Sequence, residues 1–266
     1  MSPFNPILIS LSSFGAAEVR RHGQLWFTRL AHGAGADGVE IRGELLARPA
    51  AELPAIAAAA RELSLELVYS SPQGLWSANA ELDSDALDDA LRSAALLGAP
   101  RMKMSIGGYR AQSWSTLATL KQRLRAENME LVIENDQTAG AGTLTAVLNF
   151  FDAAGNADLH LGMTFDMGNW HWTGECPLQA AQECAPLVSY VHCKGVQRQP
   201  QRWVAVPLAD SAAPWRAVLR ELPANVPWAI EYPLMGDDLE AVTRREVAAL
   251  RNLAAGFRTA AQGALA

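Results

Sequence analysis

Short apolar runs alternate with longer amphipathic stretches along almost the whole chain. Runs of strand length, bounded by glycine, proline or polar residues, predict β-strands within residues 7–12, 37–42, 65–70, 101–106, 130–136, 161–166, 189–194 and 228–231. Stretches with apolar residues at helical spacing follow them and predict helices at 17–34, 49–63, 83–97, 113–128, 143–154, 177–185, 214–222 and 238–253. A strand followed by a helix, repeated about eight times over the length of one domain, is typical of an α/β fold of the (β/α)₈ TIM-barrel type.

An open, doubly wound sheet is the alternative arrangement for the same alternation. That fold usually carries a glycine-rich phosphate-binding turn after an early strand, and the segment Ser13-Phe14-Gly15-Ala16 does not have that pattern. The sequence shows no internal repeat and no linker. We therefore expect residues 1–266 to form a single TIM-barrel domain with a frayed tail after about Phe257.

The composition indicates which classes of partner and which cellular compartment to expect. The 266 residues carry a formal net charge of -6, which disfavours a nucleic-acid partner because such a partner requires a basic surface. The three cysteines match no disulfide or zinc-binding pattern, which favours the reducing cytoplasm. The segment from Met1 to Pro6 lacks the basic and apolar parts of a signal peptide, and no apolar run is long enough to span a bilayer. We expect a soluble, cytoplasmic protein without a membrane partner.

Four side chains of metal-binding type fall at the ends of four successive strands in the second half of the chain. They are Glu134, Asp166, His192 and Glu231. Active sites of TIM barrels lie at the C-terminal ends of the strands. Because side chains alternate along a strand, Glu134 shares its direction with Val132, and His192 shares its direction with Lys194. The pattern predicts that the four side chains point into one pocket at the mouth of the barrel.

Three carboxylates and one imidazole in a single pocket predict a bound cation. Carboxylates at close range repel one another and raise each other's pKa, and a divalent cation removes that repulsion. Three oxygen ligands and one nitrogen ligand suit Mn²⁺, Mg²⁺ or Co²⁺, with Zn²⁺ less well matched. Taken singly, the residues have simpler interpretations, since Asp166 could make a turn and His192 could be a core histidine. Their occurrence on four successive strands favours the metal site.

Further side chains are directed toward the predicted site. Arg42, Lys103 and Lys194 point inward and are suited to hold a carboxylate or phosphate group of a substrate. The alternative for Arg42 is a pairing with the buried Glu40. Loops at the strand ends also carry tryptophans that can stack on a sugar, although we expect most of them only to pack. These are Trp76, Trp114, Trp170, Trp172 and Trp203.

The segments around these residues resemble a known family. The runs LVIEN, TFDMGNW, YVHCKG and AIEYP are similar to the xylose isomerase-like barrel superfamily, in its sugar-phosphate isomerase and epimerase branch. This resemblance covers nearly the whole chain. The segments DMGNWHWTGE and IENDQT look closest to the epimerases found with bacterial 2-ketogluconate utilisation.

The resemblance implies one divalent metal ion and assigns roles to its ligands. In the ketose epimerases of this superfamily, the residues that match Glu134 and Glu231 bind the metal and also form the acid/base pair, whereas Asp166 and His192 are ligands only. We predict substrate contacts from Glu40, Arg42, Lys103, Asn169, Trp170 and Lys194. The chain departs from the family at Asn169, where those epimerases usually have a histidine, and after the metal histidine, where they tend to have an acid and an arginine. The resemblance therefore does not fix the substrate.

These observations predict an isomerase or epimerase of a ketose, sugar phosphate or keto-sugar acid. It would remove the proton α to a carbonyl and form an enediolate bound to the metal. The alternatives are a lyase or dehydratase acting on a keto-sugar acid or inositol derivative, and a non-catalytic sugar-acid binding protein. A DNA-repair endonuclease would need several histidines at strand ends, and of the five histidines only His192 lies there. Members of the superfamily often form dimers or tetramers, so a homo-oligomer is a further expectation.

Overall fold

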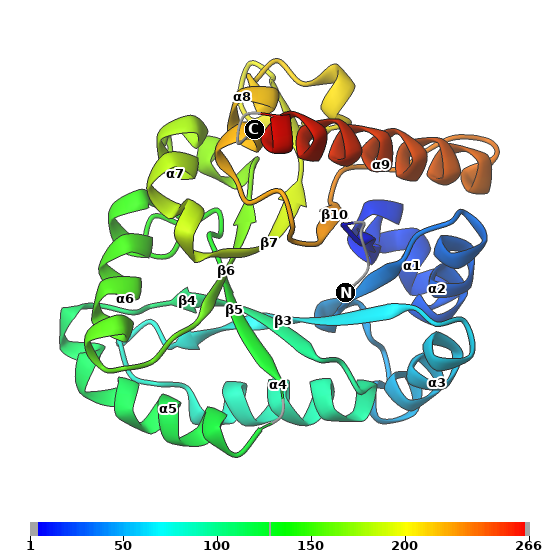
Figure 1. Cartoon of the computed structure of the whole chain (residues 1–266). Coiled ribbons are helices and arrows are strands. Elements are labelled where there is room, and N and C mark those ends of the chain that lie inside the picture. The colour runs from blue at the N-terminus through cyan, green and yellow to red at the C-terminus, as the bar shows by residue number, and fades with distance from the viewer. Residues whose placement is uncertain (1–4, 128, 264–266) are drawn as a thin grey trace.

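Eight parallel strands close into a barrel in the computed structural model, which describes residues 5–127 and 129–263 (Figure 1). Around the barrel the strands follow the order β1-β10-β7-β6-β5-β4-β3-β2. Their bounds are β1 Ile7–Ser10, β2 Gly38–Arg42, β3 Glu66–Trp76, β4 Arg101–Gly107, β5 Glu130–Glu134, β6 Gly162–Asp166, β7 Val188–Cys193 and β10 Trp228–Ile230. The predicted TIM-barrel fold is confirmed.

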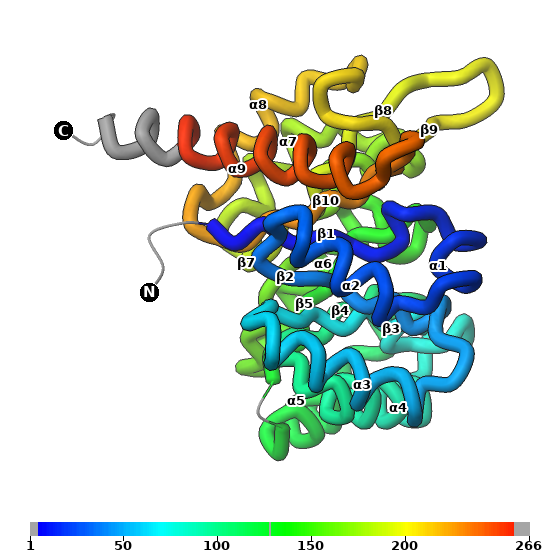
Figure 2. The backbone as a smooth tube through the Cα atoms, turned by 90° about the vertical axis from the view of Figure 1, so that its right-hand side faces the viewer, coloured from blue at the N-terminus to red at the C-terminus, as the bar shows by residue number. Residues whose placement is uncertain are grey.

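Helices cover the outside of the barrel (Figure 1, Figure 2). Their bounds are α1 Ala16–His22, α2 Gln24–Gly33, α3 Pro49–Glu62, α4 Ser84–Leu97, α5 Leu117–Arg125, α6 Leu144–Asn156, α7 Pro177–Cys184, α8 Trp215–Glu221 and α9 Leu239–Gly263. The long α9 lies against α2 and β1, so that the last helix covers the first strand of the barrel. The barrel is thus closed by elements from both ends of the chain, since β1 also pairs with β10.

Alternation along the strands separates two apolar cores. The larger core lies between the barrel and the helices and contains residues such as Ile9 and Phe165. A small core inside the barrel consists of Leu8, Val68, Tyr190 and Ala229. Because neighbouring residues on a strand face opposite sides, the residues that continue the inner face beyond this small core point into the mouth of the barrel.

The register of the strands brings polar positions to the same height. Asp166 on β6 is paired with His192 on β7, and His192 is paired in turn with Ala229 on β10. Next to β10, Ser10 on β1 is paired with Glu40 on β2. The ends of the inner faces of these strands therefore form one polar layer above the apolar inner core.

The helix predicted over residues 17–34 is two helices, α1 and α2. Gly23 separates them with a φ of 80°, a backbone conformation that glycine adopts without steric cost. A residue with a positive φ cannot continue a right-handed helix, so the chain changes direction there. The glycine in the sequence was the available signal for this break.

The third strand is longer than predicted. It does not end at Ser70 but continues through Pro72 to Trp76, and its pairing with β4 shifts register between Ser70 and Gly74. Proline lacks a backbone donor, so it is accommodated where the ladder is irregular. Beyond the shift the two strands approach so closely that a Cβ atom on Gly74 would lie 2.6 Å from the Cα atom of Gly107.

A two-stranded antiparallel hairpin, β8 Gly195–Arg198 and β9 Trp203–Val206, follows β7 and was not predicted. The helix predicted over 113–128 begins instead as a 3₁₀ segment, Ala111–Thr116, and continues as α5. The eighth barrel strand ends one residue early, so that Glu231 directly follows it.

Several expectations fall at the edges of the described chain. Asn128, the expected end of the fifth helix, and residues 1–4 of the N-terminal segment lie outside the described residues. The tail expected after Phe257 falls on the last turns of α9 and on residues 264–266, which the structure does not describe. Within the described residues, no helix combines the length and the apolar character that crossing a membrane requires.

Candidate active site

The four predicted metal ligands come together at the C-terminal mouth of the barrel. Glu134 ends β5, and Asp166 ends β6. His192 lies near the end of β7, and Glu231 directly follows β10. One ligand atom from each of these residues lies within 4.8 Å of the other three. Strand alternation and a common register are therefore sufficient to assemble the predicted set, which we call the ligand cluster.

The Nδ1 atom of His192 lies at the centre of the ligand cluster. It is 2.9 Å from Oε2 of Glu231, 3.0 Å from Oε1 of Glu134 and 3.7 Å from Oδ2 of Asp166. Three carboxylate oxygens and one imidazole nitrogen thus converge on one small region. This donor set fits a single divalent ion of the Mn²⁺, Mg²⁺ or Co²⁺ type.

The cluster has a closed side and an open side. His192 and Asp166 have no exposed surface, whereas the side chains of Glu134 and Glu231 are 15% and 11% exposed. The two glutamates therefore border the solvent side of the cluster.

Glu40 of β2 lies behind the histidine. Its Oε2 atom is 2.8 Å from Nε2 of His192, and neither side chain has exposed surface. The other oxygen, Oε1, accepts from Ser10 and Arg42 and lies 3.2 Å from Nζ of Lys103. The sequence prediction placed Glu40 among the substrate contacts, but the structure places it on the closed side of the cluster. The predicted pairing with Arg42 is present.

Three cations sit among the carboxylates. The Nζ atom of Lys103 lies 2.9 Å and 2.8 Å from the two oxygens of Glu134. The Nζ atom of Lys194 lies 2.6 Å from Oδ2 of Asp166 and 2.8 Å from Oε2 of Glu231. On the other side of that glutamate, Nη1 of Arg42 donates to Oε1 over 2.8 Å. The three cations that the sequence predicted to point inward are all in the site.

The loop after β6 fixes the orientation of Asp166. Its Oδ1 atom accepts hydrogen bonds from the backbone amides of Gly168, at 2.8 Å, and Asn169, at 2.9 Å. The turn interpretation considered for Asp166 is thus correct for one of its oxygens. The second oxygen, Oδ2, stays directed toward Lys194 and the cluster.

Asn135 and Asn169 join the ends of β5 and β6. The carboxamide of Asn135 pairs with the backbone of Asp166, donating to its carbonyl over 3.1 Å and accepting from its amide over 2.9 Å. Asn169 donates to the carbonyl of Asn135, and its Oδ1 atom accepts from Gln137 and Lys194. Asn169, predicted as a substrate contact, is therefore engaged in holding Lys194 and the loop.

Trp170 does not face the mouth of the barrel. It has no exposed surface, belongs to the core between barrel and helices, and packs on Phe165 with a ring distance of 5.5 Å. The prediction that Trp170 contacts substrate does not agree with this burial. Packing, the alternative considered for these tryptophans, describes Trp170.

Burial and neighbouring charge act in opposite directions on the acidic groups. Burial alone would raise the pKa of Glu231, but His192 and Lys194 lower it well below its usual value. Burial also opposes ionisation of Glu134, whose pKa is lowered by Lys103 and by a hydrogen bond from His192. For Asp166 burial prevails over Lys194 and raises the pKa. The two glutamates are therefore ionised at neutral pH.

The pKa of His192 is raised, whereas the pKa values of the two glutamates are lowered. Burial would lower it, but the carboxylates of Glu231 and Glu40 raise the pKa well above its ordinary value. A cation is therefore stabilised at the centre of the cluster, either as a proton on the imidazole or as an ion in its place.

Some polar residues of the site were not found from the sequence. Ser10, Asn135 and Gln137 all lie just at or after a strand end, beside predicted site residues. In the sequence only their position at a strand end pointed to them. That is weak evidence, because a polar residue after a strand is common in any loop. Their roles became visible only through the hydrogen bonds that they make.

The match to a protein family extends over most of the chain. A model of the xylose isomerase-like TIM barrel family matches residues 28–253. The chain belongs to this family. This confirms the resemblance noted in the segments around the four ligands. No curated protein matches the sequence significantly.

Solved structures of several enzymes have the same fold. An L-ribulose 3-epimerase aligns with a TM-score of 0.72 and 16% identity, covering 98% of each chain. A 3-keto-D-glucoside 4-epimerase from E. coli has a TM-score of 0.66 and 16% identity, over 93% of this chain and 99% of its own. A probable 3-DHS dehydratase from Bacillus anthracis has a TM-score of 0.68 and 15% identity, over 92% of this chain and 98% of its own. At these identities the likeness shows a shared fold.

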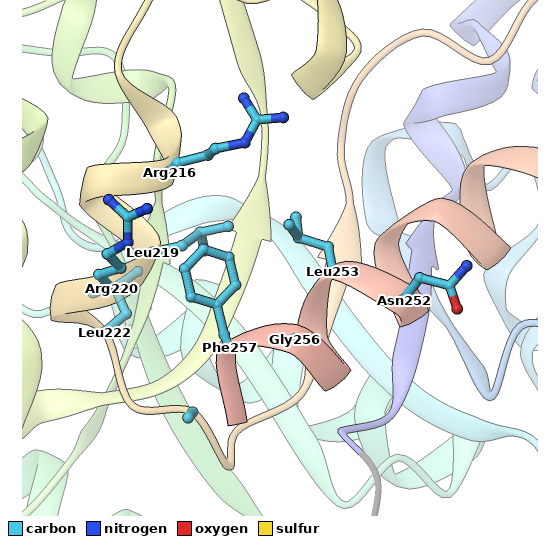
Figure 3. Close-up of a pocket in the computed structure, with 9 residues that line it drawn as sticks. Arg216, Leu219, Arg220, Leu222, Asn252, Leu253, Gly256 and Phe257 are labelled. Carbon is cyan, nitrogen blue, oxygen red and sulfur yellow. The ribbon is translucent and has the colours of Figure 1, made fainter. Parts of the chain in front are cut away.

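A separate cavity of 670 Å³ lies outside the barrel, between α8 and α9 (Figure 3). Its walls include Leu219 and Arg220 of α8, and Leu253 and Phe257 of α9. None of the residues that line it belongs to the ligand cluster. The cavity is therefore distinct from the candidate active site.

Proposed function

We propose that the protein is a divalent-metal-dependent isomerase or epimerase of a ketose, a sugar phosphate or a keto-sugar acid. The observation that carries this proposal is the placement of Glu134 and Glu231. They reach the ligand cluster from β5 and β10, the strands that flank β6 and β7, and they are the two ligands with exposed surface. Two carboxylates on either side of a metal site are what proton transfer at both faces of a carbon requires.

The metal ion and the two glutamates would have different roles in the reaction. Glu134, Asp166, His192 and Glu231 would hold a divalent ion, which when bound would supply Lewis-acid polarisation of a carbonyl group. Glu134 and Glu231 are ionised at neutral pH, so either can accept the proton α to that carbonyl. The other then delivers a proton. Delivery to the opposite face of the same carbon is epimerisation, and delivery to the neighbouring carbon is isomerisation.

Lys194 and Arg42 would stabilise the charge that develops during this transfer. Both cations contact Glu231 and lie on the side of the cluster that retains exposed surface. Negative charge moves from the glutamate to the substrate oxygen when the proton is abstracted. Fixed cations beside that path stabilise the enediolate, and loss of one such group costs about 10²–10³ in kcat in other enzymes.

Solvent deuterium exchange tests the proposal. The purified protein is incubated in D₂O with Mn²⁺ and a panel of ketoses, ketose phosphates and 2-keto sugar acids, and each α-proton is followed by NMR. We expect one α-proton signal to disappear in a metal-dependent manner, and chelator to prevent the loss. The Glu134→Gln variant, which lacks one base, should bind the same sugar but lose turnover.

Each outcome assigns a different function. Exchange with inversion identifies an epimerase, and exchange with movement of the carbonyl identifies an isomerase. Loss of a hydroxyl β to the carbanion would instead assign the dehydratase alternative, the activity named for one of the structural neighbours. Binding of a sugar acid without exchange, in wild type and variant alike, would contradict the enzyme proposal. Cytoplasmic location, homo-oligomer formation and the absence of a nucleic-acid partner stay predictions.

A further inference from the structure

We propose that Glu40 is a positioning residue that selects which nitrogen of His192 binds the metal. It would hold the Nε2 proton of the imidazole and thereby leave the Nδ1 lone pair free for the ion. This inference rests on the proposed metal site. It replaces the substrate contact predicted for Glu40 from the sequence.

The two ring nitrogens of His192 have different surroundings. Nδ1 faces three carboxylates of the ligand cluster, at 2.9, 3.0 and 3.7 Å. Nε2 faces only Glu40 within the described contacts, at 2.8 Å. A neutral imidazole carries one proton, and the nitrogen that carries it cannot donate a lone pair to an ion. The Glu40 contact therefore decides whether the ring can act as a ligand.

Glu40 reaches the histidine across the interior of the barrel. Two strands, β10 and β1, lie between β7 and β2 in the barrel order, so the contact is not made by neighbouring strands. The imidazole separates Glu40 from the carboxylates of the cluster, and Glu40 is not among the residues whose ligand atoms converge there. Its direct contact with a ligand of the cluster is the one to His192, and it also shares Lys103 with Glu134 and Arg42 with Glu231.

Both carboxylate oxygens of Glu40 have hydrogen-bonding partners. Oε1 is within 3.2 Å of donors on Ser10, Arg42 and Lys103. These three donors come from β1, β2 and β4, so they fix the carboxylate from several sides. Oε2 is left for His192. A carboxylate held in this way can only accept, which forces the proton onto Nε2.

The substitution Glu40→Gln tests this assignment sharply. Because three donors surround the Oε1 position, the amide oxygen of the glutamine must take that place, and its NH₂ group then faces Nε2 of His192. An NH₂ group there donates to Nε2 and moves the ring proton to Nδ1. We expect the affinity for Mg²⁺ and Mn²⁺ to fall by about 10–100-fold.

Two readouts separate positioning from simple loss of stability. Metal affinity is measured by titration calorimetry, and the tautomer of His192 is read from ¹⁵N NMR of wild type and variant at one Mg²⁺ concentration, chosen to load the wild type but not a variant of about 10–100-fold lower affinity. We expect Nε2 to carry the proton in the wild type and Nδ1 to carry it in Glu40→Gln. The matched control is Glu130→Gln, which removes a glutamate paired with Arg101 at the start of β5. The control should leave both readouts unchanged.

A second variant keeps the test decisive if Glu40→Gln does not fold. Glu40→Asp retains the negative charge for Lys103 and Arg42 but withdraws the carboxylate from Nε2, so metal affinity should again fall. Wild-type affinity and tautomer in either folded variant would overturn the inference. Failure of the wild-type protein to bind any divalent ion would instead overturn the proposed metal site, and the two failures are therefore distinguishable.

Discussion

At the scale of single residues, His192 is held on both ring nitrogens. Each of its ring nitrogens faces carboxylates, and its side chain has no exposed surface. Glu231 is held almost as firmly, with Arg42 on one oxygen and Lys194 on the other. A buried charge of one sign is tolerated here because charges of the other sign contact it directly.

The raised pKa of His192 predicts how metal binding depends on pH. Because that pKa lies well above its ordinary value, the metal-free ring favours a second proton on Nδ1, in addition to the one that Glu40 holds on Nε2, and an ion must displace this second proton. Metal affinity should therefore rise with pH and level off only above the raised pKa. Titration calorimetry between about pH 6 and 9, in buffers of different ionisation enthalpy, measures both the affinity and the released protons. An affinity that is flat over this range, with no proton release, would contradict the prediction.

At the scale of elements, the ends of β5 and β6 are joined through Asn135. This side chain accepts from the amide of Asp166 and donates to its carbonyl, two buried backbone groups at the end of β6. The spacing between the ligands on these strands depends on this pair of hydrogen bonds.

Replacing Asn135 by alanine should destabilise the barrel mouth measurably. The variant leaves the amide and the carbonyl of Asp166 without their partner, at a cost of about 1–3 kcal/mol for each buried group. Urea unfolding of the purified protein measures the change in the free energy of unfolding. Asn149→Ala on α6 is a suitable control, because Asn149 is exposed and should change stability little. Equal stability of the two variants would show that Asp166 is held by other means.

The sequence predicts those parts of the site that depend on local features within a single strand. Alternation and the position of strand ends place Glu134, Asp166, His192 and Glu231 correctly, because both depend only on residues within one strand. The contact between Glu40 and His192 was not predictable in this way. It spans the barrel interior, and alternation states that both side chains point inward without stating which inward residues meet.

Other differences between the predicted and the observed structure also have local causes. The sequence predicts that Trp170 contacts the substrate because it lies in a loop at a strand end, but the turn after β6 directs it into the outer core. The break at Gly23 and the strand continuing past Pro72 both occur where one residue with special backbone properties overrides the hydrophobic pattern. The β8–β9 hairpin lies in a segment that the hydrophobic pattern indicated only as a connection between a strand and a helix.

At the scale of the whole molecule, the ligands come from four strands that span half of the barrel. An ion bound by all four would link β5, β6, β7 and the segment after β10, and the last of these strands pairs with β1. The unfolded chain cannot present these residues together. Metal binding is therefore expected to stabilise the closed barrel as a unit.

A thermal melt measures this stabilisation. At an ion concentration of about 100 times Kd, binding to the folded state alone contributes about 2.7 kcal/mol. For a domain of this size that corresponds to roughly 5–10 °C in Tm. Mn²⁺, Mg²⁺ and Co²⁺ should each raise the Tm, and excess chelator should reverse the effect. His192→Ala serves as the control and should show no shift, whereas a wild-type melt indifferent to all three ions would count against the site.

The sharing of partners among the buried charges also constrains how this site can change over generations. Lys103 contacts both Glu40 and Glu134, Arg42 contacts both Glu40 and Glu231, and Lys194 contacts Asp166 and Glu231. Neutralising any one of these three cations removes one positive partner from each of two carboxylates, so single substitutions should be deleterious while matched pairs are milder. The mutational effects are then epistatic rather than additive. Among related chains, these positions should exchange their charges jointly, and a new substrate preference should arise through coordinated replacements.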